Sequence, residues 1–363
     1  MENQDILDFA NMVFSMEYGS IDFEELYPKA YSRECCHIPI HHTILEEGKI
    51  RALLDVYPVT MKLSDSEMRI KAAYIGTVAV HPRARGKGYM TQLMKQAEED
   101  AVQNGFDLML VDGDRHRYRS YGFEKAGTKY NFNVRLNNVK HCCGELYAKT
   151  AFDELKYCFE EVDEGNEHIS FLYELYTKRI VTARAKENFF LCLKSNLAIT
   201  YVILDEGKPV GYINTSHDGR NILEFEIEDS ALIPRVMYDF MREMLLDEVG
   251  ITVGADETKK LDMLEKMSDY YNMAMSHMMK ILKPEKVLTF LVEWKKKYDT
   301  SVISIDDAYK LWRELGTDDR EKVGLLTTFR CFIEAQKGNY NRLKDVSMNG
   351  LPLPFFLPDA DAF

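Results

Sequence analysis

The stretch that decides the fold is YIGTVAVHPRARGKGYM, residues 74–90, in which an apolar strand pattern runs into a basic turn that contains glycine. Apolar side chains then recur at helical spacing from Thr91 to Ala101, so the turn opens a helix. Unpaired backbone N–H groups and the positive end of the helix dipole meet at such a start. Gly86 and Gly88 carry no Cβ, so a ligand can approach the backbone closely. The stretch therefore predicts a phosphate-binding turn.

Two common nucleotide motifs do not fit this turn. The P-loop requires G-x-x-x-x-G-K-[ST], and the dinucleotide pattern G-x-G-x-x-G fails at Thr91, where its last glycine would stand. The run RARGKG, residues 83–88, instead resembles the coenzyme A loop of the GNAT superfamily of N-acetyltransferases, whose pattern is [QR]-x-x-G-x-[GA]. Arg83, Gly86 and Gly88 match all three fixed positions of that pattern.

A second motif follows in the order that the same family shows. Residues 106–111, FDLMLV, read as the next strand, and RYRSYGF at 117–123 resembles the family's Y-x-x-x-G-F turn. The resemblance implies an acetyl-CoA-dependent N-acetyltransferase domain with a mixed central sheet. It also implies that the central strands splay near residues 78–80, where the pantetheine arm of the cofactor pairs with free backbone groups like an added strand.

The residues expected to contact acetyl-CoA lie on the strand, on the turn and in the loop after the next strand. They are Val78, Ala79, Val80, Arg83, Arg85, Gly86, Lys87, Gly88, Tyr89, Met90, Gly113 and Asp114. Backbone N–H groups near residues 78–80 are expected to polarise the thioester carbonyl.

The 363 residues are too many for one such domain, and the second half repeats the first in a weaker form. The turns EGK at 47–49 and EGK at 206–208 occupy comparable places in two predicted hairpins. The strand-to-helix turn of the second half, EDSAL at 228–232, is acidic and has no glycine, so we expect it to repel a pyrophosphate. One active site per chain follows.

This order resembles the Eis-like acetyltransferases, the enhanced intracellular survival family, and homo-oligomers are expected from the same resemblance. The predicted fold class is α+β or α/β, with tandem GNAT folds whose splayed sheets are flanked by helices. In that family the third part resembles a sterol-carrier fold, so a small, reduced α/β segment is expected here. The predicted domains are a catalytic one at 1–138, a degenerate copy at 145–285 and the C-terminal segment at 286–363, whose tail packs toward the active site. Residues 140–153 are expected to connect the two copies.

Two residues are expected to carry the catalysis. Tyr118 matches the tyrosine that acts as the general acid in the family, and an ordinary pKa of about 10 keeps a phenol protonated at pH 7. In Eis-like enzymes the base is the C-terminal carboxylate, and the apolar, proline-rich tail here ends at Phe363. A histidine between His37 and His42 is the alternative base, with His37 or His41 lining the amine pocket.

The composition indicates which kinds of partner the protein binds and which it does not. With 46 Lys and Arg against 59 Asp and Glu, the net charge of −13 argues against nucleic-acid binding and favours cationic partners. No run of 18 apolar residues exists, so no membrane-spanning helix is expected. An acidic start without a leader and seven cysteines without a CxxC pair indicate a cytoplasmic protein. The cysteines and histidines at 35–42 lack zinc spacing, so no metal is expected.

The sequence thus predicts acetyl transfer from acetyl-CoA to a primary amine of a cationic small molecule or a lysine, by direct attack in a ternary complex. The alternative is a coenzyme A-binding or scaffolding protein without turnover. Retention of Tyr118 argues against that alternative.

Overall fold

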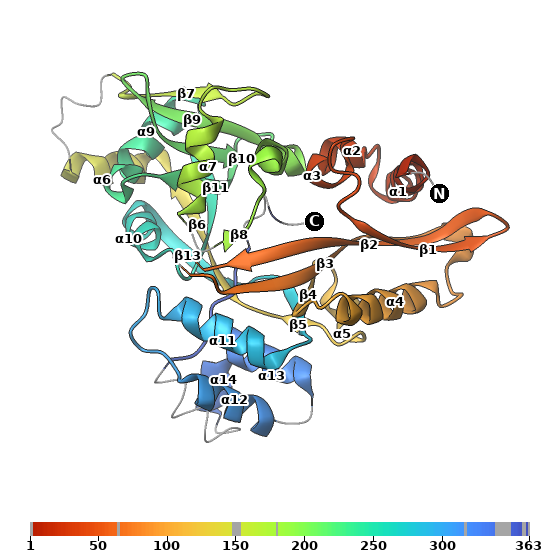
Figure 1. Ribbon diagram of the computed structural model, residues 1–363. Coiled ribbons are helices and arrows are strands. Elements are labelled where there is room, and N and C mark those ends of the chain that lie inside the picture. The colour runs from red at the N-terminus through yellow and green to blue at the C-terminus, as the bar shows by residue number, and fades with distance from the viewer. Residues whose placement is uncertain are drawn as a thin grey trace.

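The computed structural model describes residues 3–63, 66–146, 154–178, 181–315, 318–337, 350–357 and 361. Within this part of the chain the strands form two sheets of seven strands each. Figure 1 shows the long strands of the first sheet in orange across the middle, several strands of the second sheet in green above them, and the C-terminal helices in blue below.

The first sheet has the order β1-β2-β3-β4-β14-β5, with β8 added beside β2. Its strands are β1 (Ile40–Glu46), β2 (Lys49–Lys62), β3 (Arg69–Val80), β4 (Leu108–Val111), β5 (Glu124–Lys125), β8 (Val181–Thr182) and β14 (Met278–Ile281). Its helices include α1 (Asn3–Tyr18), α2 (Phe23–Leu26), α3 (Pro28–Tyr31), α4 (Tyr89–Gln103) and α5 (Arg115–Arg119). The pair β3 and β4 is parallel and is joined by α4, as the strand and helix patterns predict.

The two central strands are buried on both faces. On β3, Ile75 points to the core beneath α4, while its neighbour Tyr74 points to the core shared with the C-terminal helices. On β4, Met109 points to the core beneath α4, and Leu110 points to the core shared with the C-terminal helices. Continuous apolar sequence is typical of strands covered on both sides. Helices α1 to α3 cover the face opposite α4 near the end of β3, as Figure 1 shows.

The second sheet has the order β13-β6-β12-β11-β10-β9-β7. Its strands are β6 (Thr128–Arg135), β7 (Tyr157–Glu161), β9 (Ile199–Asp205), β10 (Lys208–Thr215), β11 (Asn221–Ile227), β12 (Glu248–Gly254) and β13 (Ser268–Met275). Its helices are α6 (Leu136–Leu146), α7 (Ile169–Thr177), α8 (Phe189–Lys194), α9 (Ile233–Glu243) and α10 (Thr258–Met267). The parallel pair β11 and β12 is joined by α9, as β3 and β4 are by α4. The predicted mixed α/β class with tandem folds is confirmed.

The two sheets exchange strands, so they do not divide the chain at the expected boundaries. Strand β6, expected in the first copy, pairs with β12 of the second sheet, and β14, expected in the second copy, pairs with β4 of the first. Gly127 lies where the chain passes between the sheets, and a Cβ there would stand 1.7 Å from the carbonyl oxygen of Phe355. The three-domain division at 1–138, 145–285 and 286–363 stays a proposal.

The prediction that residues 140–153 connect the two copies is wrong for residues 140–146. Residues 140–146 belong to α6, which buries Val139, Cys142 and Cys143 in the core of the second sheet. The spacing of these three residues is helical, but polar neighbours obscure it in the sequence. Residues 147–153 lie outside the described part of the chain.

The C-terminal segment differs from the expected α/β form. Its elements within the described residues are the helices α11 (Pro284–Lys295), α12 (Ile305–Glu314), α13 (Asp319–Thr327) and α14 (Arg330–Gln336), with no strand among them. Val287, Leu291 and Trp294 of α11 are buried against the first sheet at helical spacing, which explains why a helix forms there.

The apolar tail is buried, as its composition predicts. Leu353 and Phe355 are inaccessible, and the Leu353 N–H donates to the carbonyl of Leu326 at 2.7 Å. Farther along, the carboxylate of Asp361 accepts hydrogen bonds from Arg184 at 2.8 Å and from Thr182 of β8 at 2.5 Å.

Arg184 is the centre of a buried ion cluster. Besides Asp361, it binds the carboxylate of Glu224 on β11 at 2.6 Å, and all three residues are more than nine-tenths buried. Because Thr182 belongs to a strand paired with β2, this cluster connects the tail with both sheets. Removing one partner of such a buried group typically costs about 3–5 kcal/mol.

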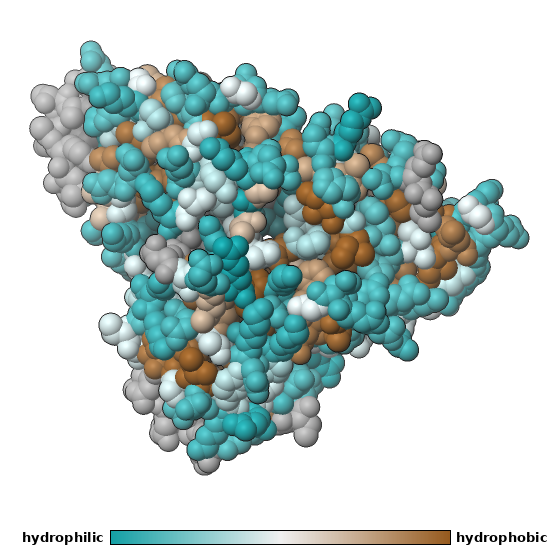
Figure 2. Space-filling view, viewed as in Figure 1, coloured by the Kyte–Doolittle hydropathy of each residue, from teal (hydrophilic) through white to brown (hydrophobic). Residues whose placement is uncertain are grey.

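The surface agrees with the net charge. In the view of Figure 2 hydrophilic residues cover most of the molecule, with hydrophobic ones in small groups between them. No helix among the described residues has both the length and the apolar character needed to cross a membrane.

Candidate active site

The site begins where two central strands separate. β3 pairs with β4 only through residues 72–75, whereas it pairs with β2 as far as Val80. A register shift in the β2–β3 pairing marks a bulge, and Thr77 takes a φ of 47° there. Among the described strands, none pairs with the β4 side of residues 76–80. The sheet splays as expected, but the separation begins after residue 75, earlier than the expected residues 78–80, and it leaves backbone groups available to an extended ligand.

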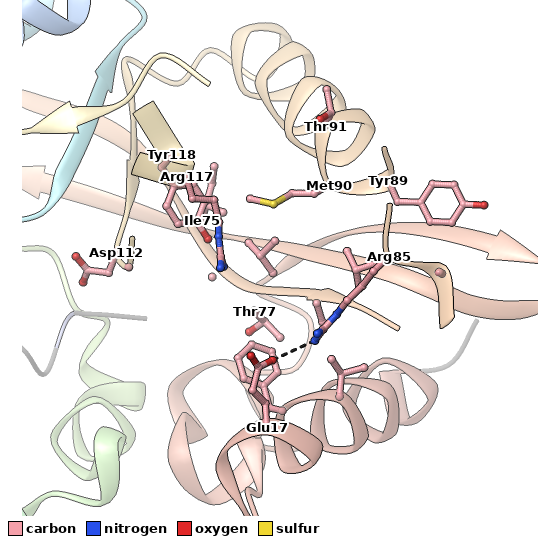
Figure 3. Close-up of a pocket in the computed structure, with 18 of the residues that line it drawn as sticks. Glu17, Ile75, Thr77, Arg85, Tyr89, Met90, Thr91, Asp112, Arg117 and Tyr118 are labelled. Carbon is pink, nitrogen blue, oxygen red and sulfur yellow. Dashed lines mark hydrogen bonds and ion pairs between the residues drawn. The ribbon is translucent and has the colours of Figure 1, made fainter. Parts of the chain in front are cut away.

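A cavity of about 820 Å³ occupies this opening. Its walls are β3, the turn before α4, the loop after β4, helix α5 and one face of α1. The residues that line it are Val13, Phe14, Glu17, Tyr18, Ile75, Gly76, Thr77, Val78, Ala79, Val80, Ala84, Arg85, Gly86, Gly88, Tyr89, Met90, Thr91, Asp112, Gly113, Arg117 and Tyr118. Figure 3 shows ten of them labelled around the cavity.

Most of the predicted cofactor residues line this cavity. Nine do: Val78, Ala79, Val80, Arg85, Gly86, Gly88, Tyr89, Met90 and Gly113. Three do not, namely Arg83, Lys87 and Asp114. The ammonium of Lys87 lies 2.7 Å from Glu46, and Asp114 caps α5 by accepting the N–H of His116 at 2.9 Å.

The turn has the geometry that its glycines predict. Gly86 and Gly88 have φ values of 81° and 78°, a conformation that other residues adopt only with strain. A Cβ at either position would meet nothing within 4 Å, so open space lies in front of the turn. Gly88 is the N-cap of α4 and has no side chain with which to cap the helix, so the first N–H groups of α4 are available to an anion.

Helix α1 closes one side of the cavity, and sequence reasoning did not predict this. Glu17 of α1 pairs with Arg85 at 3.1 Å, the dashed line in Figure 3, and both side chains are about half exposed. A phosphate bound at the turn would compete with Glu17 for Arg85. The sequence contains no local signal for this contact, because the two residues are distant in the chain and follow no motif.

Tyr118 lies on α5 with its ring in the cavity. Tyr118 is 95% buried. Its ring packs closely against Gly113, because a Cβ added to Gly113 would stand 3.3 Å from Cε2 of the ring. Burial raises the pKa of Tyr118, so the phenol holds its proton at neutral pH. The structure thus places this predicted residue beside the opened strands, while its catalytic role stays a prediction.

Asp112 is a cavity residue that sequence reasoning missed. Its half-exposed carboxylate accepts a hydrogen bond from Tyr74 at 2.8 Å and lies 3.2 Å from Nε2 of His277. Burial raises the pKa of Asp112, but the hydrogen bond and charge of His277 outweigh burial and hold this pKa below its ordinary value. The carboxylate is therefore ionised at neutral pH. His277 immediately precedes β14, so the strand exchange brings it here, which no local pattern could indicate.

The histidines expected at the amine pocket lie elsewhere. His41 binds Asp55 through Nδ1 at 2.6 Å, His42 lies 2.8 Å from Asp100, and neither His37 nor His41 lines the cavity. Within the described ranges, no group of three or more His, Cys, Asp or Glu side chains could hold a metal ion. Phe363 lies outside the described residues.

The corresponding opening in the second sheet is filled. β11 and β12 pair only at residues 221–222, and Phe356 of the tail lines the gap beyond. The ammonium of Lys260 donates to the Phe225 carbonyl at 2.5 Å, and a cavity of only about 10 Å³ remains. At the turn that follows, the carboxylate of Asp229 accepts the N–H of Ala231, where an anion would bind. That only one active site exists per chain stays a prediction.

Comparison with known proteins agrees with this description. The family model for the acetyltransferase (GNAT) domain matches residues 1–126. No curated protein matches the sequence. Among solved structures, a probable N-acyltransferase from Enterococcus faecalis V583 is 14% identical with a TM-score of 0.60, covering 79% of this chain and 72% of that one.

Two further structures have the same architecture. A GCN5-related N-acetyltransferase from Kribbella flavida is 15% identical with a TM-score of 0.56, covering 79% of this chain and 72% of that one. Eis1 from Mycobacterium abscessus is 12% identical with a TM-score of 0.52, covering 80% of this chain and 74% of that one. At these identities the likeness shows the fold. The family match assigns residues 1–126 to an acetyltransferase (GNAT) domain, and the structural likeness extends the shared fold over 79% of the chain.

Proposed function

We propose that the protein is an acetyl-CoA-dependent N-acetyltransferase that acts on a primary amine of a cationic small molecule or of a lysine. The observation that carries this proposal is the single cavity that joins an anion-binding turn, a free strand edge and a buried phenol. These are the three features that a thioester of coenzyme A needs for binding and reaction.

Each part of the cofactor has a matching surface. The pyrophosphate binds at Gly86 and Gly88 with Arg85 beside it, where backbone N–H groups and the α4 dipole favour negative charge. The pantetheine arm lies along residues 76–80, whose backbone groups substitute for the missing strand. The thioester then ends beside Tyr118.

The acceptor enters at the acidic end of the cavity. Asp112 presents an ionised carboxylate there, and the net charge of −13 attracts cations to the molecule as a whole. An ammonium bound near Asp112 recovers part of the free energy that it loses with its hydration shell.

The reaction is a direct attack in a ternary complex. The neutral amine attacks the thioester carbonyl, whose developing negative charge is stabilised by backbone N–H groups near residues 78–80. The C–S bond breaks as the intermediate collapses, and Tyr118 gives its proton to the leaving thiolate. The nitrogen loses a proton, which re-protonates Tyr118, so the products are the amide and free coenzyme A.

Two carboxylates are proposed as alternative bases for the first proton of the ammonium: the terminal carboxylate of Phe363 and the fully buried carboxylate of Asp55. His41 is a weaker candidate, because its Nδ1 is bound to Asp55 and its ring does not line the cavity. An α-carboxylate has an ordinary pKa of about 3.5, so it acts best when partly desolvated or through a water molecule.

Release of thiol from acetyl-CoA with a panel of amines tests the function, and replacing Tyr118 with phenylalanine tests the mechanism. We expect turnover with at least one cationic amine. The Tyr118→Phe variant should lose roughly 10²- to 10⁴-fold in kcat, the usual contribution of one general acid, with little change in acetyl-CoA affinity.

The control for this variant is Tyr157→Phe, which changes a buried tyrosine of the second sheet. It should keep the kcat of the wild type. Tight coenzyme A binding without thiol release from any amine would identify a binding protein, and wild-type kcat in Tyr118→Phe would remove Tyr118 from the mechanism.

One glycine added after Phe363 tests the proposed base. The extension moves the carboxylate by about 3.5 Å and keeps every side chain of the tail. A base reaches only about 2.6–3.2 Å, or one water farther, so if the terminal carboxylate is the base, kcat falls while the melting temperature stays unchanged. Full turnover by the extended chain would show that the terminal carboxylate is not the base.

A further inference from the structure

A chain of short hydrogen bonds leads from the cavity into the protein. Oγ1 of Thr77 lies 2.6 Å from the phenol oxygen of Tyr31, which lies 2.5 Å from Oδ2 of Asp55. Nδ1 of His41 lies 2.6 Å from the other carboxylate oxygen. Asp55 is fully buried, and Tyr31 and Thr77 are more than nine-tenths buried. Only Thr77 of this group lines the cavity.

The chemistry of these groups fixes the direction of the bonds. The phenol of Tyr31 donates its only proton to Oδ2 of Asp55. The oxygen of Tyr31 then accepts from Thr77, since the phenol has no second proton to donate. The hydroxyl of Thr77 therefore donates its only proton to Tyr31. Toward the cavity its oxygen can only accept a hydrogen bond.

The position of Thr77 indicates which group of the reactants it meets. A thioester carbonyl is itself an acceptor, so the Thr77 hydroxyl cannot stabilise it. Thr77 belongs to the bulge of β3, and its hydroxyl is turned toward Tyr31 of α3. Tyr27, which directly precedes α3, is close enough to Asp112 that burial and then the charge of Asp112 raise its pKa to about 12. Thr77 and the ionised carboxylate of Asp112, which attracts an ammonium, line the same cavity.

We propose, on the basis of the proposed function, that Thr77 accepts an N–H of the acceptor ammonium and passes its proton through Tyr31 to Asp55. The substrate proton moves to Oγ1 of Thr77, the Thr77 proton to Tyr31, and the Tyr31 proton to Oδ2 of Asp55. One N–H and two O–H bonds break, and three O–H bonds form. The ammonium becomes a neutral amine, the carboxylate becomes a neutral acid, and the total charge is unchanged.

This route gives the amine what it needs in order to attack. An alkylammonium with an ordinary pKa of about 10.4 is almost wholly charged at pH 7 and has no lone pair. Transfer to Asp55 neutralises two charges inside the protein at once, which reduces the cost of burying both. After turnover the proton returns by the same chain to water in the emptied cavity. Thr77 is the group that touches the substrate, and Tyr31 and Asp55 act through it.

The competing interpretation is that these bonds only hold the bulge in shape. Two substitutions at Thr77 separate the two roles. Thr77→Ser keeps the hydroxyl, and Thr77→Val keeps the branched shape but cannot accept or relay a proton. Tyr31→Phe removes the next oxygen of the chain and leaves the ring in place.

The experiment measures thiol release with an amine that the wild type acetylates, and coenzyme A binding by calorimetry. In Thr77→Val and Tyr31→Phe we expect kcat to fall roughly 10²-fold with a smaller change in the amine KM, while Thr77→Ser stays within about threefold of the wild type. The double variant should be no slower than either single one, because the groups act as a unit. The coenzyme A Kd should be unchanged in all.

Several outcomes would overturn the inference. Wild-type kcat in Thr77→Val, or equal losses in Thr77→Ser and Thr77→Val, would show that the hydroxyl relays nothing. A weakened coenzyme A Kd with unchanged amine kinetics would place a pantetheine N–H at Thr77 instead. Turnover by the wild type leaves the proposed function standing in each of these cases. No thiol release by the wild type with any amine would overturn both.

Discussion

The separation of β3 from β4 after Ile75 is the constraint on which the site depends. Beyond that residue β3 is paired with β2 on one side only, and its other edge faces the cavity. A buried backbone group without a partner costs about 1–3 kcal/mol, so such an edge favours a ligand that can pair with it. The same divergence makes room for the turn before α4 and the ring of Tyr118.

The second sheet shows what happens when the same opening is not used. There β11 and β12 also part after a short pairing, but the tail residue Phe356 and the ammonium of Lys260 fill the space. Asp229 caps the following turn with a negative charge. Of the two related openings in this chain, one is therefore an open cavity and the other is filled. The tail that fills the second opening is held near both sheets by the buried pair of Arg184 and Asp361.

Local features of the site could be predicted from the sequence. The turn at 83–88 is defined by glycines that need positive φ and by its place between a strand and a helix, and all of these are adjacent in the chain. Tyr118 is fixed by a motif that begins in the short helix α5 and ends in the turn after it. These predictions agree with the placement in the structure because no distant contact enters them.

Features that depend on distant pairing could not be predicted. Hydrophobic periodicity can indicate that a segment is a strand, but it cannot indicate that β6 and β14 exchange sheets. Asp112 becomes a site residue through His277, and Thr77 becomes one through Tyr31 and Asp55. The contact between Glu17 of α1 and Arg85, which makes α1 a wall of the cavity, likewise joins residues that are distant in the chain. Each of these contacts needs the register of two sheets, which single-sequence patterns do not contain.

The central claim is that one cofactor binds per chain, at the turn before α4. Calorimetric titration with coenzyme A tests it most directly, with Gly88→Val as the disrupted variant and Gly207→Val as its match, since both glycines have a φ of 78° and open space around them. We predict a stoichiometry of one for the wild type and for Gly207→Val, with binding severely weakened in Gly88→Val. Two molecules per chain, or unchanged affinity in Gly88→Val, would contradict the account.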